Sequence, residues 1–191
     1  MRAFIAFNFP EQLKNQLYQM QNVLKSVSDS GSWVNRDNFH ITMKFLGEID
    51  EIYVEDIDKI LKNISENNSP LNIRLNNLGY FNKKNNEYGV VWSGMEGDID
   101  RLNSIYDLLE EEMCKIGFPK EKRKFSPHIT LARKMRTNLD FQQIRDNVKP
   151  YLGNQYILES ISLMKSEVIM NKRVYSKIVS YKLINQNINH R

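Results

Sequence analysis

The sequence predicts an α+β chain built from mostly antiparallel strands. Stretches of alternating apolar residues, typical of half-buried strands, are interspersed with three or four stretches of helical periodicity. In addition, the tripeptide His-Ile-Thr occurs twice, at 40–42 and 128–130, and the copies lie 88 residues apart in a chain of 191. A repeat at close to half the chain length predicts two similar lobes, each contributing one strand to a shared central groove.

In the first half of the chain, strands and helices alternate. Residues 2–8 alternate in polarity and predict a strand, and a helical pattern begins at Pro10. Gly31-Ser32 break that pattern. Residues 39–46 are apolar and β-branched enough for a second strand, which Gly47 ends, and residues 52–64 predict a second helix.

The middle of the chain predicts a hairpin, a long helix and a strand. Residues 71–81 and 87–95 form the two arms of the hairpin. Residues 98–116 predict a helix that Gly117 closes as a C-cap. The strand at 128–134 then contains the second His-Ile-Thr copy.

The last part of the chain predicts a short helix at 141–148 and a second hairpin. Its arms are 157–170 and 173–183, joined by Asn171-Lys172. The tail after Asn185 is polar, and we expect it to be frayed. Since no linker stands out, residues 1–191 are interpreted as a single two-lobed domain.

The two His-Ile-Thr copies present the same side chains on one strand face. Residues i and i+2 of a strand point to the same side, so His40 lies beside Thr42, and His128 beside Thr130. The residues between and after them are apolar and are expected to face the core: Ile41, Met43, Ile129 and Leu131. Each strand therefore presents an imidazole and a hydroxyl together.

Two imidazoles across a groove can perform general acid–base chemistry near neutral pH. A neutral ring takes a proton from water, while a charged ring protonates a leaving oxygen. The threonine hydroxyls can hydrogen-bond a phosphoryl oxygen. This division of labour suits hydrolysis of a phosphodiester without a metal or cofactor, and the sequence contains no His-X₃-His or Cys-X₂-Cys spacing.

The chain resembles the two-histidine phosphoesterase superfamily, which is marked by two His-X-Thr-X motifs. Within it, the chain is most similar to the RNA 2′,3′-cyclic phosphodiesterases, also called the 2′-5′ RNA ligase family. The matching segments are Met1-Arg2-Ala3-Phe4-Ile5-Ala6, Trp33-Val34, His40-Ile41-Thr42-Met43-Lys44-Phe45-Leu46-Gly47 and Phe125-Ser126-Pro127-His128-Ile129-Thr130-Leu131-Ala132-Arg133. The resemblance covers nearly the whole chain, and Met43 stands where leucine is common.

The resemblance implies a bilobal α+β fold with pseudo-symmetric lobes, antiparallel sheets around a central groove and helices outside. It implies opening of an RNA 2′,3′-cyclic phosphate to a 2′-phosphate, with His40 as proton donor to the leaving oxygen and His128 as proton acceptor from water. Thr42 and Thr130 would bind the phosphate. Arg133 matches a family arginine that contacts the phosphate.

Strict alternation does not place Arg133 on the histidine face. It is five residues after His128, and Phe45 has the same offset from His40. Either the two strands bend or end there, or these side chains lie outside the groove. We interpret Phe45 as a core residue rather than a platform for a stacked base. Trp33 and Trp92 are interpreted as packing residues, although either could line a base pocket.

The charge distribution favours an RNA end over a small nucleotide. The chain has 27 basic and 23 acidic residues, a net charge of +4. Several basic residues cluster around the second motif: Lys120, Lys122, Arg123, Lys124, Arg133, Lys134 and Arg136. Such a cluster is typical of a phosphate-binding surface when it surrounds a catalytic motif, and otherwise of a solvated face.

We expect a cytoplasmic monomer whose partner is RNA with a 2′,3′-cyclic phosphate end, tRNA fragments among the candidates. The N-terminal segment lacks the long apolar stretch of a signal peptide, and no apolar run reaches membrane-spanning length. The one cysteine, Cys114, cannot form an internal disulfide, and we interpret it as a buried structural thiol. His190, in the polar tail, is expected to have no role.

Two other functions stay open from the sequence. One is hydrolysis of a different cyclic phosphate, such as a cyclic nucleotide or ADP-ribose cyclic phosphate. The other is an RNA- or nucleotide-binding module without turnover, which the intact histidines and threonines of both motifs argue against. The reverse reaction, 2′-5′ ligation, would use the same catalytic groups and is not excluded.

Overall fold

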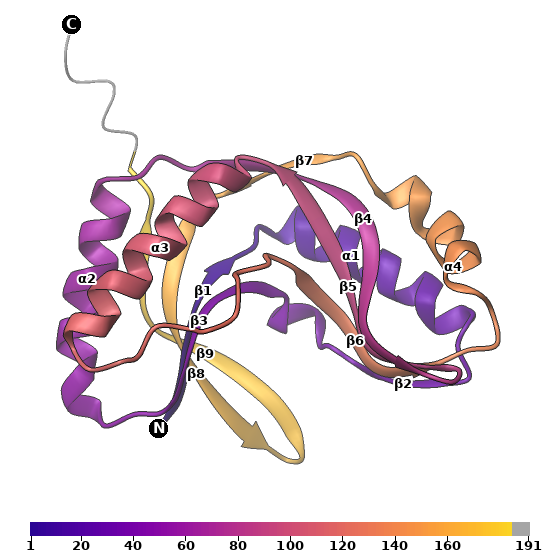
Figure 1. The fold of residues 1–191 in the computed structure, drawn as a ribbon, viewed down its shortest axis with the longest axis horizontal. Helices are drawn as coiled ribbons and strands as arrows, with labels where there is room; N and C mark the ends of the chain where they lie inside the picture. Colours follow the sequence, from indigo (N-terminus) through magenta and orange to yellow (C-terminus); the bar gives the residue numbers. More distant parts are fainter. Residues whose placement is uncertain (185–191) are drawn as a thin grey trace, which may run out of the picture.

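The computed structural model describes residues 1–184, and in this range the chain forms two antiparallel sheets and four α-helices (Figure 1). This confirms the predicted α+β class. The first sheet has the strand order β3-β1-β8-β9. Its strands are β1 (Arg2–Asn8), β3 (His40–Glu48), β8 (Ser160–Ile169) and β9 (Lys172–Lys182).

The second sheet has the order β2-β6-β5-β4-β7. Its strands are β2 (Ser30–Trp33), β4 (Leu71–Lys84), β5 (Glu87–Gly97), β6 (Ile129–Arg136) and β7 (Gln155–Leu158). The chain crosses repeatedly between the sheets, so each lobe contains segments from both halves of the sequence. The first His-Ile-Thr copy lies in β3 of one sheet and the second copy at the start of β6 in the other.

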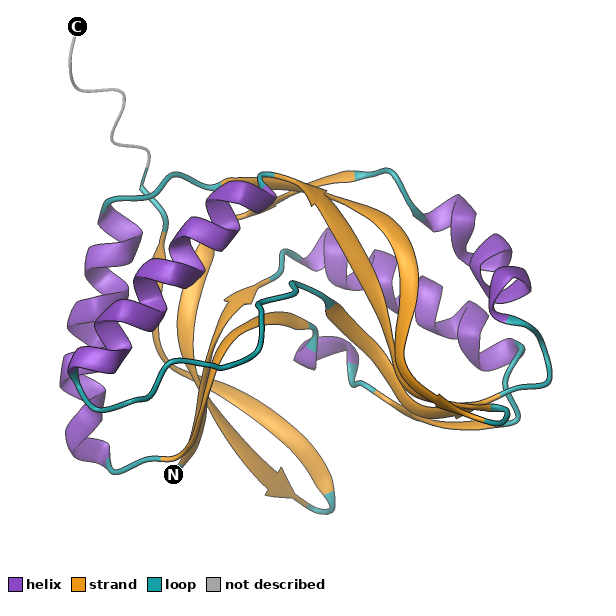
Figure 2. Ribbon diagram, viewed as in Figure 1, coloured by secondary structure: helices purple, strands orange, loops and turns teal. Residues whose placement is uncertain are grey.

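Helices flank the two sheets (Figure 2). Helix α2 contacts β8 and β9 and packs against α3, whereas α1 and α4 contact strands of the second sheet. The helices are α1 (Glu11–Ser26), α2 (Val54–Glu66), α3 (Ile99–Lys115) and α4 (Phe141–Val148), and the 3₁₀ turns are η1 (Arg36–Asn38), η2 (Glu51–Tyr53) and η3 (Lys149–Tyr151). None of the helices in residues 1–184 is both long and apolar enough to cross a bilayer.

Strand β3 contains a bulge directly after Thr42. Ile5 of β1 pairs with Lys44, and the next residue of β1, Ala6, pairs with Thr42, so that Met43 is the extra residue. As a result, the consecutive residues Met43 and Lys44 are both buried. The alternation then resumes one residue out of phase.

Strand β6 contains the same bulge at the same place after its threonine. Val91 of β5 pairs with Ala132, and Trp92 pairs with Thr130, so that Leu131 is the extra residue. Leu131 and Ala132 are both buried. The two lobes therefore share a structural irregularity as well as a sequence motif, which supports their pseudo-symmetry.

Two predictions about strands are wrong in detail. Gly31-Ser32, expected only to break a helix, lie in β2, a four-residue edge strand whose Ser-Gly-Ser-Trp sequence has no apolar alternation. The expected single strand at 157–170 is split at Glu159 into β7 and β8, which belong to different sheets. Periodicity cannot show this change of sheet, because both strands are extended.

Cys114 is exposed, so the prediction of a buried thiol is wrong. It lies on α3 directly after Met113, which is fully buried. Because successive helical residues are turned by about 100°, a neighbour of a buried position can face solvent. The tail after Asn185 lies outside the described residues.

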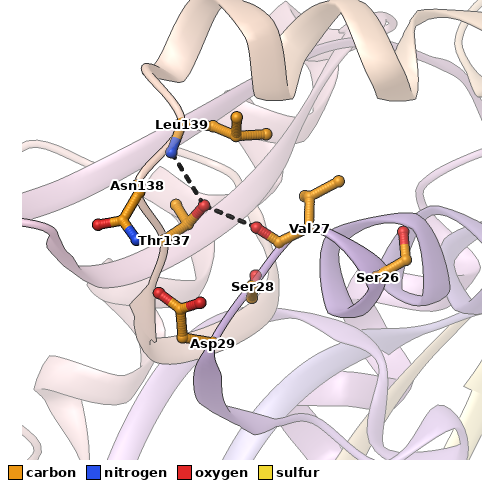
Figure 3. Close-up of a pocket in the computed structure, with 7 residues that line it drawn as sticks. All are labelled: Ser26, Val27, Ser28, Asp29, Thr137, Asn138 and Leu139. Atoms are coloured by element: carbon orange, nitrogen blue, oxygen red, sulfur yellow. Dashed lines mark hydrogen bonds between the residues drawn. The ribbon is translucent and has the colours of Figure 1, made fainter.

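The end of β6 is anchored to the end of α1 by a buried threonine. The Thr137 hydroxyl donates to the main-chain oxygen of Val27 at 2.6 Å and accepts from the main-chain nitrogen of Leu139 at 3.2 Å (Figure 3). These residues line a hollow that contains neither motif histidine. The contact is structural, since it fixes the connection from β6 to α4.

A buried ion pair connects the first motif to the segment that leads to the second. The Nζ atom of Lys44 lies 2.6 Å from Oε1 of Glu110 on α3, and the two side chains are only 2% and 7% exposed. Lys44 also donates to the main-chain oxygen of Pro119 at 2.9 Å, while Oε2 of Glu110 accepts from the main-chain nitrogen of Glu121 at 2.6 Å. The pair thus holds the start of the loop that precedes β6.

We expect Lys44→Met to destabilise the protein by about 3–5 kcal/mol, because it leaves the Glu110 carboxylate buried without its partner. The double variant K44M/E110M should lose less stability than the sum of the two single changes. Denaturant unfolding measures both, with the exposed Lys59–Glu55 pair as control, where Lys59→Ala should leave the free energy of unfolding nearly unchanged. A Lys44→Met protein as stable as the wild type would contradict this account.

Candidate active site

Both motif histidines are held in the same way. His40 is the first residue of β3, and His128 directly precedes β6. Nδ1 of His40 lies 2.6 Å from the main-chain oxygen of Asn38, and Nδ1 of His128 lies 2.8 Å from that of Ser126. A carbonyl oxygen can only accept, so Nδ1 of each ring carries the hydrogen. In the neutral ring, Nε2 is then the basic nitrogen.

The predicted sharing of one strand face by each histidine and its threonine agrees with the burial pattern. Ile41 and Ile129 are fully buried, whereas Thr42 and Thr130 are only partly buried. In the first motif, Nε2 of His40 lies 2.9 Å from Oγ1 of Thr42. With the hydrogen on Nδ1, the threonine hydroxyl is the donor in this contact. The Thr42 hydroxyl is therefore placed beside Nε2 of His40, where it could donate to an oxygen of a bound substrate.

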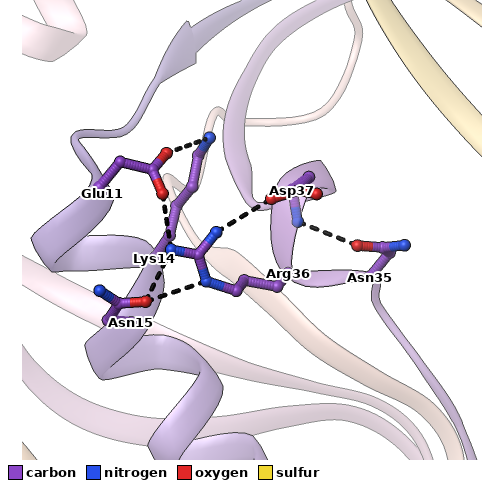
Figure 4. Close-up of polar contacts among 6 residues, drawn as sticks. All are labelled: Glu11, Lys14, Asn15, Asn35, Arg36 and Asp37. Atoms are coloured by element: carbon purple, nitrogen blue, oxygen red, sulfur yellow. Dashed lines mark hydrogen bonds and ion pairs between the residues drawn. The ribbon is translucent and has the colours of Figure 1, made fainter.

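A polar network holds the turn that precedes His40 (Figure 4). The Arg36 guanidinium donates to Oε2 of Glu11 at 2.6 Å, to Oδ1 of Asn15 and to Oδ1 of Asp37. Arg36 begins η1, and Asn38 ends it. Exposed ion pairs of this kind contribute little to the free energy of unfolding. Their effect here is to orient η1 and with it the Asn38 carbonyl that receives the His40 hydrogen.

Aromatic rings pack beside each histidine, and they come from strands distant in sequence. The ring centroid of His40 lies 4.9 Å from that of Phe4 and 5.4 Å from that of Tyr175. The ring centroid of His128 lies 5.1 Å from that of Phe81 and 6.2 Å from that of Trp92. The first three of these neighbours could not be found from the sequence, because no local pattern links them to the motifs.

The tryptophans are both packing residues, as interpreted, and one also borders the site. Trp92 packs against Phe81 as well as His128, and within residues 1–184 its buried indole nitrogen has no hydrogen-bond partner. Trp33 packs against the core, with the Lys25 ammonium 5.6 Å above its ring.

The pKa of His40 is lowered from its ordinary value. Burial of the ring is the main cause, because it penalises the charged form, and the hydrogen bond to the Asn38 carbonyl acts in the opposite direction. The positive charge of Arg133, and that of His128 when its ring is protonated, lower the pKa of His40 further. His128 and Arg133 belong to the other lobe, so the fold brings the two motifs within electrostatic reach of one another.

The bulge in β6 explains the position of Arg133. After Leu131 and Ala132 both face the core, Arg133 returns to the face of His128 and Thr130 and is exposed. The strand therefore bends, which was one of the two alternatives left open. The bulge in β3 does the same for Phe45, which is 67% exposed, so the prediction of a core residue is wrong.

The basic cluster around the second motif divides into two parts. Lys120, Lys122, Arg123 and Lys124 are exposed in the loop that leads to β6. Two members of the cluster are paired with carboxylates: Nε of Arg136 lies 2.8 Å from an oxygen of Glu87, and Nζ of Lys120 lies 3.9 Å from Oε1 of Glu111. His190 lies outside the described residues. Within residues 1–184, no group of three or more His, Cys, Asp or Glu side chains is placed to hold a metal ion.

Comparison with known proteins gives consistent similarities. The family model described as LigT-like phosphoesterase matches residues 8–92 and 95–174, and each matched segment contains one His-Ile-Thr copy. The chain is 31% identical over 181 residues to the RNA 2′,3′-cyclic phosphodiesterase of Methanocaldococcus jannaschii, covering 93% of this chain and 98% of the relative. The protein of the same name from Thermotoga maritima is 35% identical over 133 residues, 70% of each chain.

Solved structures share the fold at lower sequence identity. A crystal structure from Thermus thermophilus superposes with a TM-score of 0.79 at 22% identity, covering 96% of this chain and 98% of that one. Escherichia coli LigT complexed with 3′-AMP gives a TM-score of 0.77 at 20% identity with the same coverage. At this identity, the likeness shows the architecture alone.

We expect the imidazole of His40 to titrate below about pH 6.5, the ordinary value for histidine. Since Arg133 contributes positive charge, Arg133→Gln should raise the pKa of His40, while Lys59→Gln on the distant helix α2 should leave it unchanged. Histidine NMR titration of the free protein measures these values. A His40 pKa at or above 6.5, or one that falls in Arg133→Gln, would contradict the electrostatic description.

Proposed function

The chain belongs to the LigT-like phosphoesterase family, and we propose that it hydrolyses the 2′,3′-cyclic phosphate at an RNA end to a 2′-phosphate. One observation carries the proposal. Each lobe holds a histidine whose Nδ1 is fixed on a main-chain carbonyl, and charge in one lobe acts on the ring in the other. A pair of imidazoles so arranged can exchange protons with a substrate held between the lobes.

In the proposed reaction, Nε2 of His128 takes a proton from a water molecule. The water oxygen attacks phosphorus and forms the new P–O bond, while the bond from phosphorus to the 3′ oxygen breaks. Protonated His40 gives its Nε2 proton to that leaving oxygen, which becomes the 3′ hydroxyl. The product keeps the phosphate on the 2′ oxygen, and the two rings regain their starting states by proton exchange with solvent.

The remaining site residues would bind the phosphate. The hydroxyls of Thr42 and Thr130 lie on the histidine faces and would donate to the phosphoryl oxygens. Arg133, on the face of His128, would offset the charge that develops on those oxygens. A bound cyclic phosphate is an anion, so it would raise the pKa of His40 by opposing the positive charges that lower it in the free protein. Substrate binding would thereby favour the protonated form of His40, which is the form that acts as the acid.

We further propose that residues 1–191 act as one functional domain, because the acid and the base come from different lobes. It requires no metal or cofactor, since the two rings supply both proton transfers and Arg133 supplies the positive charge. The reverse reaction, ligation of two RNA ends through a 2′-5′ bond, would use the same groups by microscopic reversibility. The exposed basic loop at 120–124 favours an RNA end over a cyclic nucleotide or ADP-ribose cyclic phosphate.

We expect an oligoribonucleotide ending in a 2′,3′-cyclic phosphate to be converted to a 2′-phosphate end at the same rate with and without EDTA. The position of the product phosphate is read by ³¹P NMR or by chromatography against both standards. A 3′-phosphate product would contradict the proposed leaving group. Loss of activity in EDTA with recovery on addition of Mn²⁺ or Mg²⁺ would show that a metal is needed.

We also expect the basic loop to contribute to RNA binding. The triple variant K122A/R123A/K124A should bind an oligonucleotide more weakly, and the slope of log affinity against log salt should flatten by about 0.7 for each phosphate contact that is lost. Turnover of a mononucleotide 2′,3′-cyclic phosphate should change much less.

The matched control for this prediction is K59A/K62A/K115A, which removes three exposed charges from helices α2 and α3. It should bind the oligonucleotide as the wild type does. Equal losses on the oligonucleotide and the mononucleotide in the loop variant would argue against an RNA footprint on this loop.

A further inference from the structure

The β8–β9 hairpin extends beyond the sheet to which it belongs. Strand β1 pairs with β8 only as far as Ala3 and Lys165, whereas β8 and β9 continue to pair out to Ile169 and Lys172. The hairpin is visible as a projecting ribbon in Figure 1. We call residues 166–175 the arm. A two-stranded ribbon without a third strand is marginally stable by itself, so contacts with the rest of the protein must position it.

Those contacts place one strand of the arm beside His40 and the turn that precedes it. The main-chain oxygen of Arg173 accepts from Nδ2 of Asn38 at 2.8 Å, and Asn38 is the residue whose carbonyl holds Nδ1 of His40. The ring of Tyr175 packs against Phe4 at 4.8 Å between centroids and against His40 at 5.4 Å. The arm therefore starts at the catalytic histidine and leads away from it.

The register divides the hairpin into two faces of different charge. Residues directly paired across the strands share a face, so Tyr175, which contacts His40, lies on the same side as its partner Ser166. The neighbouring pairs on this side are Val168 with Arg173 and Met164 with Lys177. This side thus carries two basic residues and no acidic one.

The opposite side of the hairpin carries two basic residues and one acidic residue. It carries the pairs Lys165 with Ser176, Glu167 with Val174 and Ile169 with Lys172. Here Glu167 accepts an ion pair from Lys165 at 2.8 Å. Each side therefore has two basic residues, and only the side that faces His40 has no carboxylate to offset them.

The tip of the arm exposes apolar side chains. Val168 is 61% exposed and Met170 is 93% exposed. Met170 and Asn171 both have positive φ, at 47° and 61°, which is the turn geometry that glycine and asparagine favour. A methionine with positive φ is conformationally unfavourable, and because the Met170 side chain is exposed, packing within the protein does not offset this cost. Basic residues beside an aromatic ring and exposed apolar groups are the components of a single-stranded nucleic-acid surface.

We propose that the side of the β8–β9 hairpin with Arg173, Lys177 and Tyr175 binds the RNA nucleotides immediately upstream of the cyclic phosphate. This inference rests on the proposed function. A 2′,3′-cyclic phosphate ends a strand, so the rest of the RNA leaves the histidines in one direction only. Arg173 and Lys177 contact its phosphates, while Val168 and Met170 contact bases. Because no carboxylate lies on this side of the hairpin, its charge favours binding of a polyanion such as RNA over binding of a protein surface.

The test compares two double variants of the same hairpin. R173A/K177A removes two charges from the side that faces His40, and K165A/K172A removes two from the opposite side. The probe is an oligoribonucleotide ending in a 2′-phosphate, the proposed product, whose affinity is measured across a salt series. We expect R173A/K177A to lower affinity about tenfold or more and to flatten the salt slope by about 1.4, or about 0.7 for each charge. K165A/K172A should match the wild type.

Measurements of kcat/KM distinguish the RNA site on the arm from the proposed hydrolysis on which it rests. R173A/K177A should keep wild-type kcat/KM on a mononucleotide 2′,3′-cyclic phosphate and lose it on the oligonucleotide. Unchanged oligonucleotide affinity in R173A/K177A, or equal losses in the two double variants, would overturn the arm as an RNA site. If the wild type hydrolyses neither cyclic phosphate while binding still depends on Arg173 and Lys177, the proposed catalysis fails and the RNA site stands.

Discussion

The hydrogen bond from each imidazole to the main-chain oxygen two residues earlier is the constraint on which the site depends. It fixes the tautomer of His40 through Asn38 and that of His128 through Ser126, and it makes Nε2 the basic nitrogen of each ring, which in His40 accepts from the Thr42 hydroxyl. An acid–base pair requires both properties, because a ring that can rotate or change tautomer presents the wrong nitrogen for part of the time. The network around Arg36 and the aromatic rings beside each histidine support this arrangement from outside the motifs.

The repeated bulge serves both the site and the fold. In β6 it turns Arg133 toward the face of His128, and in β3 it turns Lys44 into the interior. Once buried, Lys44 requires an opposite charge, which Glu110 provides, and together they hold the main chain at Pro119 and Glu121. One irregularity in a strand thus couples the first motif to the segment leading to the second.

The sequence predicts the helices, the strands and the catalytic motifs better than it predicts which side chains pack beside the motif histidines. Periodicity located most of the helices and strands, and the i, i+2 rule placed each histidine with its threonine. A bulge adds one residue without a sequence signal, so alternation alone misplaced Phe45 and left Arg133 undecided. Phe4 and Tyr175 reach His40 only through sheet pairing over long sequence separations, and the change of sheet at Glu159 likewise depends on tertiary structure.

The proposed mechanism requires that the rings of His40 and His128 act as one unit. A double-mutant cycle on kcat/KM with a cyclic-phosphate substrate measures this directly. His40→Ala and His128→Ala should each lower the rate by about 10²–10⁴-fold while the protein stays folded. The double variant should be hardly slower than either single one, because residues that act together lose activity non-additively. His190→Ala, which removes the histidine outside the motifs, should be fully active. Losses that multiply, or a folded single variant with wild-type turnover, would contradict the paired mechanism.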